Sequence, residues 1–175
     1  RALLNLKDVQ GAHQFARQAY ENRTRHTNLI IANVTNFIRH YYNVLIRLKD
    51  YDTAYSVLDG LSAEISEDSV NFGAVLALKA DLYMKTEKYD RALETAERAV
   101  GFPGVSNRPN DLAAKILCLA SLKAGKFDRI DRDVGVYIEL ANADPKAMLQ
   151  IAKAAKEQSK HELATRLRDA AATKQ

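Results

Sequence analysis

The chain is 175 residues long, 47% hydrophobic and 27% charged, with a formal net charge of +4, values that are ordinary for a folded domain or a short repeat array. Its 7 Gly and 3 Pro are too few for the many turns of a β-sandwich, and its charge is too small for the dense Lys/Arg clustering of a dedicated nucleic-acid binder. The single cysteine excludes an intrachain disulfide framework and a cysteine-based zinc site.

The N-terminal stretch, residues 1–26, contains one helical pattern. Within residues 8–23, Ala12, Ala16 and Ala19 recur at intervals that put them on one face of a helix. We interpret this helix as the remnant of an earlier repeat, of which it would form the second half.

The next segment, residues 29–48, is the most apolar early part of the chain. Polar side chains such as Asn33, Arg39 and Arg47 interrupt it, so it predicts an amphipathic helix rather than a membrane span. No run approaches the roughly 18 uninterrupted apolar residues that a bilayer requires, and we expect no membrane insertion.

Four short segments that follow resemble one another. Each has a lysine one or two residues before an aromatic or imidazole ring, with an acidic residue directly after the ring. The ring positions are 38, 38 and 34 residues apart, a regularity that predicts a repeat architecture. The four ring positions are Tyr51, Tyr89, Phe127 and His161.

Helical patterns flank each of these segments. Before Tyr89, apolar residues recur at Leu76, Ala80 and Tyr83, and a second such pattern starts at Ala92. This predicts two antiparallel helices joined by a tight turn. The acidic residue after the ring is expected to cap the second helix by accepting from its free backbone amides. The ring itself is expected to seal the interior of the hairpin.

These residues resemble the tetratricopeptide repeat (TPR) family. The best copy has Leu76, Ala80, Tyr83, Tyr89, Ala92, Ala99 and Pro103 at the positions of the family motif. The resemblance implies an all-α fold of tandem helix-turn-helix repeats, a right-handed α-α superhelix of about eight or nine helices. It covers residues 27–175, divided into four repeats at 27–68, 69–108, 109–144 and 145–175.

The chain departs from the family pattern in two ways. Because the 38-residue spacing exceeds the usual 34, we expect extended loops at residues 62–68 and 101–110. No polar helix follows the last repeat, so we expect a piece of a longer protein whose C-terminal end packs on more chain.

No catalytic or metal-binding pattern stands out, and we predict neither an enzyme nor a cofactor. The histidines, His13, His26, His40 and His161, are not spaced as metal ligands. His161 occupies a ring position and is expected to pack. Cys118 occupies the small-residue position of a first helix and is expected to be a buried packing residue. Carboxylates at residues 128–133 alternate with arginines, as on a solvated helix surface.

The resemblance also implies a binding groove, because the first helix of each pair lines the concave face in such arrays. By register, the predicted ligand-facing residues are Asn36, Arg39, Asn43, Arg47, Ala77, Asp81, Lys85, Lys115, Leu119, Lys123, Lys146, Lys153, Lys156 and Glu157. Eight of them are Lys or Arg and two are acidic, which makes +6 on this face, against +4 for the whole chain. Such a surface favours an acidic partner segment.

The carboxylate clamp that some family members use is disfavoured. Arg39 and Asn43 could mimic two of its members. The remaining positions fall on Leu78, Leu112 and Ile116, whose side chains cannot hold a carboxylate.

We therefore predict a non-catalytic protein-interaction scaffold or adaptor module of a larger protein, whose basic concave groove binds an acidic or extended peptide segment. Two alternatives stay open: single-stranded RNA binding along the groove, which the scarcity of exposed rings disfavours, and a TPR segment of a bacterial secretion or exopolysaccharide export machine. Self-association through open repeat ends is a further expectation. We expect a cytoplasmic location, with a periplasmic one left open.

Overall fold

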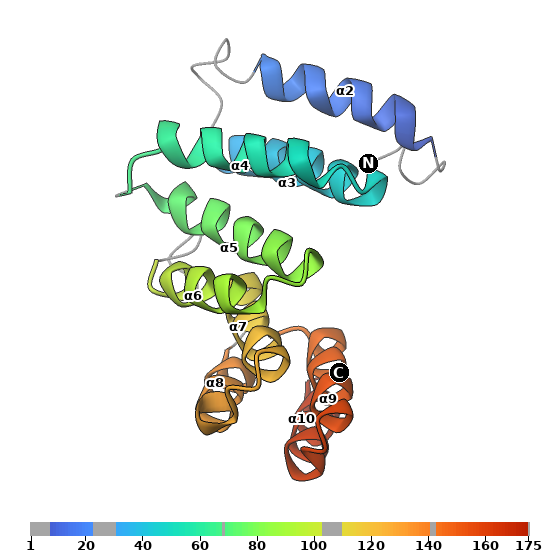
Figure 1. The fold of residues 1–175 in the computed structure, drawn as a ribbon, viewed down its shortest axis with the longest axis vertical. Helices are drawn as coiled ribbons and strands as arrows, with labels where there is room; N and C mark the ends of the chain where they lie inside the picture. The colour runs from blue at the N-terminus through green and yellow to red at the C-terminus, as the bar shows by residue number, and fades with distance from the viewer. Residues whose placement is uncertain (1–7, 23–30, 68, 103–109, 141–142, 175) are drawn as a thin grey trace.

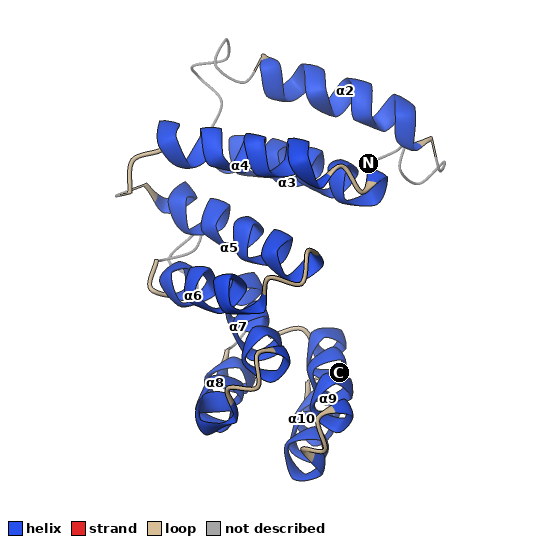
Figure 2. Cartoon of the chain, viewed as in Figure 1, coloured by secondary structure: helices blue, strands red, loops and turns tan. Residues whose placement is uncertain are grey.

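The computed structural model describes residues 8–22, 31–67, 69–102, 110–140 and 143–174. These residues form α-helices and no strand (Figure 2). The helices are α2 (Val9–Glu21), α3 (Ile31–Leu48), α4 (Tyr51–Glu64), α5 (Val70–Lys85), α6 (Tyr89–Val100), α7 (Asp111–Lys123), α8 (Phe127–Glu139), α9 (Pro145–Glu157) and α10 (His161–Thr173). Helix α2 lies at one end of the longest axis of the molecule, and α8, α9 and α10 lie at the other (Figure 1). The expected all-α helical repeat architecture is confirmed.

The helices fall into two series. We call α3, α5, α7 and α9 the first helices, and α4, α6, α8 and α10 the second helices. Each first helix packs against the second helix that follows it and against the next first helix. The first helices therefore form a continuous row. The division into repeats at the residues given above stays a prediction.

Helix α2 packs against α3, where its Tyr20 ring lies 5.4 Å from that of Tyr41. Ala12 is buried, and Ala16 packs against the core beneath α3. The helix expected between residues 8 and 23 is thus present. None of the helices that the structure describes is long and apolar enough to cross a membrane.

The same main-chain turn joins the first to the second helix in all four pairs. The residue two positions before each ring has a positive φ: Lys49 (58°), Glu87 (59°), Gly125 (69°) and Ser159 (59°). In each case the next amide donates to the carbonyl five residues back, for example from Lys88 to Tyr83 at 2.9 Å. This is the Schellman closure of a helix C-terminus. Only one of the four residues is glycine, the residue that adopts this conformation without strain.

The backbone conformation at Gly125 predicts a measurable stability effect. A Cβ there would meet no atom within 4 Å, so Gly125→Ala changes only the backbone strain at φ +69°. We expect a loss of about 1 kcal/mol in the free energy of unfolding. Gly60→Ala is the matched control, because Gly60 lies inside α4 with equal space for a Cβ. We expect it to gain about 0.5–1 kcal/mol from helix propensity. Urea unfolding of both variants tests this, and equal shifts would contradict the strain at Gly125.

The acidic residues after the rings do not cap the second helices. Each second helix begins at the ring itself, so the N-cap is the residue before it. Lys88, Lys126 and Lys160 occupy that place without a side-chain cap. Only Asp50 caps, by accepting from the Thr53 amide at 3.2 Å. The expected capping role is therefore wrong: the acidic residues lie within the first turn, where they interact favourably with the helix dipole.

The ring positions are also less uniform than expected. Tyr51, Tyr89 and Phe127 are half-buried, whereas His161 is exposed. The expectation that His161 packs is wrong. Lys160 of the next helix pair covers the Phe127 ring, whereas His161 begins α10, the last helix that the structure describes.

Small residues let the helices approach closely. Ala80, Ala92 and Ala99 have no exposed surface. A Cβ on Gly73 would lie 2.5 Å from the Cβ of Phe102, so only glycine fits there. Cys118 is fully buried, as expected, and burial raises the pKa of its thiol.

The lysines at the turns reach back to the preceding helix pair. The ammonium group of Lys88 lies 4.6 Å from the centre of the Tyr55 ring in α4, and that of Lys160 lies 4.3 Å from the centre of the Phe127 ring in α8. Both distances are within the range of a cation–π contact. These lysines therefore help to join consecutive pairs.

Asp133 in α8 is not on a solvated surface, contrary to the sequence-based expectation. It is buried, accepts from the Ser121 hydroxyl of α7 at 3.0 Å, and pairs with Arg129 at 2.8 Å. Arg129 also pairs with Glu97 of α6. Because a carboxylate removed from water needs such partners, this network joins three helices.

The loop lengths differ from the prediction. Helix α4 continues to Glu64, so the connection expected at residues 62–68 is partly helical. Residues 103–109 lie outside the described part of the chain, and with them Pro103 and most of the second expected loop.

Candidate functional site: a cavity across the first helices

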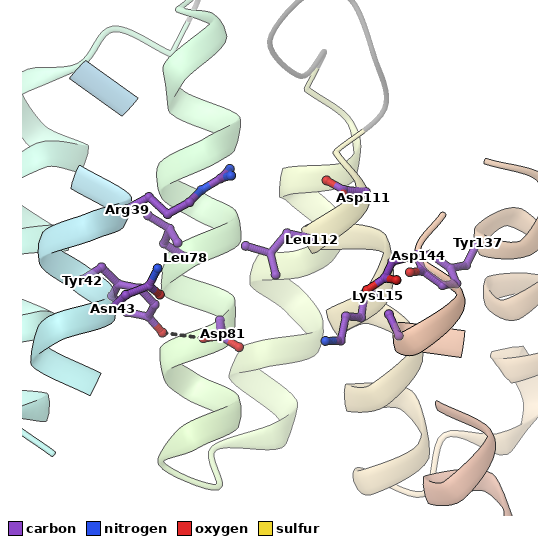
Figure 3. A pocket seen from close by; sticks show the side chains of 11 residues that line it. Arg39, Tyr42, Asn43, Leu78, Asp81, Asp111, Leu112, Lys115, Tyr137 and Asp144 are labelled. Carbon is purple, nitrogen blue, oxygen red and sulfur yellow. Dashed lines mark hydrogen bonds between the residues drawn. The ribbon is translucent and has the colours of Figure 1, made fainter. Parts of the chain in front are cut away.

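A cavity of about 290 Å³ opens on the row of first helices (Figure 3). It draws side chains from α3, α5, α7, α8 and α9 and from Asp144, which lies between α8 and α9. Its lining consists of Arg39, Tyr42, Asn43, Leu78, Asp81, Asp111, Leu112, Lys115, Tyr137, Asp144 and Ala147. It thus spans residues that are far apart in sequence and come together only because the first helices stack side by side.

The floor of the cavity is apolar. Leu78 of α5 and Leu112 of α7 line it (Figure 3), and Leu112 packs against the core cluster that contains Leu78. Leu78 is buried, and Leu112 is half-buried against three core clusters. The cavity floor is therefore part of the core between α5 and α7.

A partly buried hydrogen bond fixes the wall between α3 and α5. The Tyr42 hydroxyl donates to the Asp81 carboxylate at 2.7 Å, shown by the dashed line in Figure 3. Burial, followed by the charge of Asp81, raises the pKa of the Tyr42 hydroxyl, which therefore stays a donor at neutral pH. The Tyr42 side chain thus links two consecutive helix pairs.

The opposite wall contains Tyr137 and Asp144. Burial raises the pKa of Tyr137 to about 12, so its hydroxyl is neutral. Asp144 caps α9 by accepting from the Lys146 amide at 3.0 Å, directly before Pro145 at the first position of that helix. Both side chains therefore have structural partners at this edge of the cavity.

The charges in the cavity are mixed. Arg39 and Lys115 face three carboxylates, those of Asp81, Asp111 and Asp144. Within the described residues, neither Arg39 nor Lys115 forms an ion pair. The cavity can thus offer two cations to a ligand, but its lining is not uniformly basic.

The predicted groove residues separate into four groups. Arg39, Asn43, Asp81 and Lys115 line the cavity. Outside it, on exposed parts of the first helices, are Arg47, Lys85, Lys123, Lys146, Lys153, Lys156 and Glu157. Asn36 lies in α3, but its side chain is outside the described part of the structure. Ala77 is buried in the core, and Leu119 is half-buried.

The groove residues predicted from the repeat register did not include several of the residues that line the cavity. Leu78 and Leu112 were placed toward the groove only as reasons against a carboxylate clamp. Tyr137 comes from a second helix, and Ala147 follows the cap of α9. No sequence signal places a second-helix residue in this cavity, because its position depends on how far α9 turns away from α8.

The cations of the two helix series differ in their partners. Of the six arginines on the second helices, three pair with an acidic residue earlier in the array: Arg98 with Glu67, Arg129 with Glu97 and Arg166 with Asp131. On the first helices, Lys123 pairs with Glu157 at 3.3 Å. The first-helix cations without an ion pair among the described residues are Arg39, Arg47, Lys85, Lys115, Lys146, Lys153 and Lys156. Positive charge is therefore most available on the first helices.

Helix dipoles account for part of this pattern. Each first helix has a basic residue in its last turn: Arg47, Lys85, Lys123 and Lys156. A cation there interacts favourably with the negative end of the dipole. Arg39, Lys115, Lys146 and Lys153 lie outside those turns, so this explanation does not cover them. Within the described residues, no group of His, Cys, Asp and Glu could hold a metal ion.

Comparison with known proteins gives the fold. No family model matches the chain, and no curated protein matches it in sequence. A solved structure of MamA (MSR-1, C2), a TPR-like repeat protein, is similar, with a TM-score of 0.54 and 17% identity. The match covers 98% of this chain and 96% of MamA.

The chain has a TPR-like helical repeat fold. At 17% identity, the likeness to MamA gives the fold and no more.

Proposed function

We propose that this TPR-like chain is a non-catalytic protein-interaction scaffold whose first-helix row binds an acidic segment of a partner protein. A TPR-like fold is in general a scaffold for protein binding, which supports the broader part of the proposal. The observation that carries the finer part is the set of first-helix cations without ion pairs, which includes Arg39, Lys115 and Lys153. A ligand carboxylate can pair with these groups without displacing an intramolecular partner.

The mixed charge of the cavity limits where on the first-helix row an acidic segment can bind. Asp111 lies at its rim without an ion pair in the described structure, so an acidic segment would be repelled at that end. Favourable contacts are expected from Lys115 toward Lys123 and Lys153. The acidic part of the partner would therefore lie over α7 and α9, at the side away from Asp111.

Charge reversal on the first helices tests this function. We define the groove variant as Lys115→Glu with Lys153→Glu, and the control variant as Arg91→Glu with Arg168→Glu. All four are cations without an ion pair among the described residues, and the control pair lies on second helices. In affinity capture from a lysate of the source cell, read by mass spectrometry, the groove variant is expected to lose a partner at least about tenfold.

The control variant is expected to retain that partner, because it carries the same change in net charge elsewhere. Equal recovery of every protein by the wild type and the groove variant would contradict the proposal. Recovery of RNA in place of a protein would favour the nucleic-acid alternative. That alternative has little support in the cavity, where Tyr42 and Tyr137 are buried and offer no open ring for a base.

Self-association is a second, weaker proposal. Phe15 of α2 and Leu149 of α9 are exposed large apolar side chains near the two ends of the described array. They are single residues rather than a continuous apolar patch, which gives a second copy little surface to cover.

A further inference from the structure

The exposed side of α7 alternates apolar and positively charged side chains. Leu112, Lys115, Leu119 and Lys123 follow one another at spacings of three, four and four residues, which puts them on one stripe of the helix. Leu112 and Leu119 are half-buried, so part of each remains at the surface. Leu112 and Lys115 line the cavity, and Lys123 meets Glu157 at the other end of α7. We call these four residues the α7 stripe.

We propose that the α7 stripe binds an acidic amphipathic helix of the partner protein. Apolar side chains of that helix contact Leu112 and Leu119, and its carboxylates pair with Lys115 and Lys123. This inference rests on the proposed function. It adds the conformation of the bound segment and the spacing of its side chains.

The spacing of the two leucines selects a helix over an extended peptide. Leu112 and Leu119 are seven residues apart in α7, which corresponds to about 10.5 Å along the helix axis. A ligand helix alongside α7 repeats its apolar stripe every seven residues, at the same distance of about 10.5 Å. An extended peptide places side chains of one face about 6.8 Å or about 13.6 Å apart, and neither distance matches the separation of the two leucines.

The charges around the α7 stripe complement acidic side chains. Lys115 has no ion-pair partner in the described part of the structure, and the neighbouring α9 adds Lys146 and Lys153, which are equally free. Glu157 is the carboxylate nearest to Lys123 and leaves that lysine partly exposed. Asp111 lies at the Leu112 end of the stripe, so the sign of the charge favours carboxylates between the two apolar contacts and beyond Leu119, and disfavours them before Leu112.

A side-chain pattern for the ligand follows. In a helix parallel to α7, apolar residues at positions 1 and 8 face the leucines, and acidic residues near positions 4 and 12 face the lysines. A helix in the opposite direction carries the same pattern reversed. A peptide of about 15 residues contains the whole pattern.

Selection from a random library tests this inference. Peptides of about 15 residues displayed on phage would be selected on the full 175-residue chain and counter-selected on its Lys115→Glu, Lys123→Glu variant. We expect the enriched peptides to have two apolar residues seven positions apart with Asp or Glu between them. A synthetic copy of one such peptide is expected to gain helical circular dichroism when it binds.

The outcomes separate the two proposals. Enriched peptides that are acidic but lack the seven-residue spacing, or stay non-helical when bound, would overturn the helix and leave the acidic groove standing. Enriched peptides that are not acidic, or bind the variant equally well, would overturn both.

A point substitution adds a direct measurement. Leu119→Ala is expected to weaken binding of a selected peptide at least about fivefold, because it removes one of the two apolar contacts. Val136→Ala is the matched control, since Val136 is an exposed apolar residue of α8 outside the α7 stripe. Both variants would first be shown to melt like the wild type. If they bind the peptide equally well, Leu119 is not a contact and the inference fails.

Discussion

Substitution of Ala92 by arginine is expected to remove the cooperative unfolding of the α5–α6 pair. Ala92 has no exposed surface and packs in one cluster with Ala80, Ala96 and Ile116. An arginine there needs volume that the close-packed interface lacks, and it brings an unpaired charge out of water. Together these effects exceed about 4 kcal/mol, a large part of the total stability of an ordinary domain.

Circular dichroism and hydrogen exchange measure this effect. The Ala92→Arg chain is expected to lose helical signal and to lose amide protection in α5, α6 and α7 first, because repeats contact mainly their neighbours. Glu94→Arg is the control, since Glu94 is exposed on the same helix. An unchanged melting temperature for Ala92→Arg would show that the register of the repeat is wrong.

Removal of the Asp133 carboxylate is the second large effect. Asp133→Ala leaves the fully buried Ser121 hydroxyl and the largely buried Arg129 without their shared acceptor. We expect a loss of about 2–4 kcal/mol, below the full value for a buried ion pair because Arg129 keeps Glu97. The melting temperature is expected to fall by about 5–15 °C.

The Asp133→Asn variant removes the negative charge at residue 133 and keeps the shape of the side chain. The amide oxygen still accepts from Ser121, so the loss is expected to be smaller than for alanine. Thermal and urea unfolding of both variants would be compared with Arg132→Ala, because Arg132 is exposed and meets Asp133 only at 3.4 Å. If Asp133→Ala unfolds like Arg132→Ala, the network contributes little to stability.

The helical repeat could be predicted because the spacing of rings and small residues follows from packing. A ring that begins each second helix and alanines that permit close approach leave a periodic trace in the sequence, and Ala80, Ala92 and Ala99 are all fully buried. The details at helix ends could not be predicted. An aspartate caps a helix or lies in its first turn according to the residue at which the helix begins. A difference of one residue decides between the two, and the ring spacing does not determine where the helix begins.

The site could be predicted only in part. Register placed Arg39, Asn43, Asp81 and Lys115 on first helices, and the structure brings these four around one cavity. Which cations stay without an ion pair depends on side chains from other repeats, as with Lys123 and Glu157, which are 34 residues apart. The buried role of Asp133 was missed for the same reason, since Ser121 and Glu97 belong to other helices.

The turn shared by the four helix pairs has a consequence for how much the sequence can vary. Main-chain amides and carbonyls close it, so lysine, glutamate, glycine and serine all occupy the same place in it. A substitution there changes the stability by about 1 kcal/mol and leaves the path of the chain unaltered. The backbone shape of such a turn therefore depends very little on which side chains occupy it. A chain built on it can become unrecognisable to a family model and still superpose on MamA over 98% of its length.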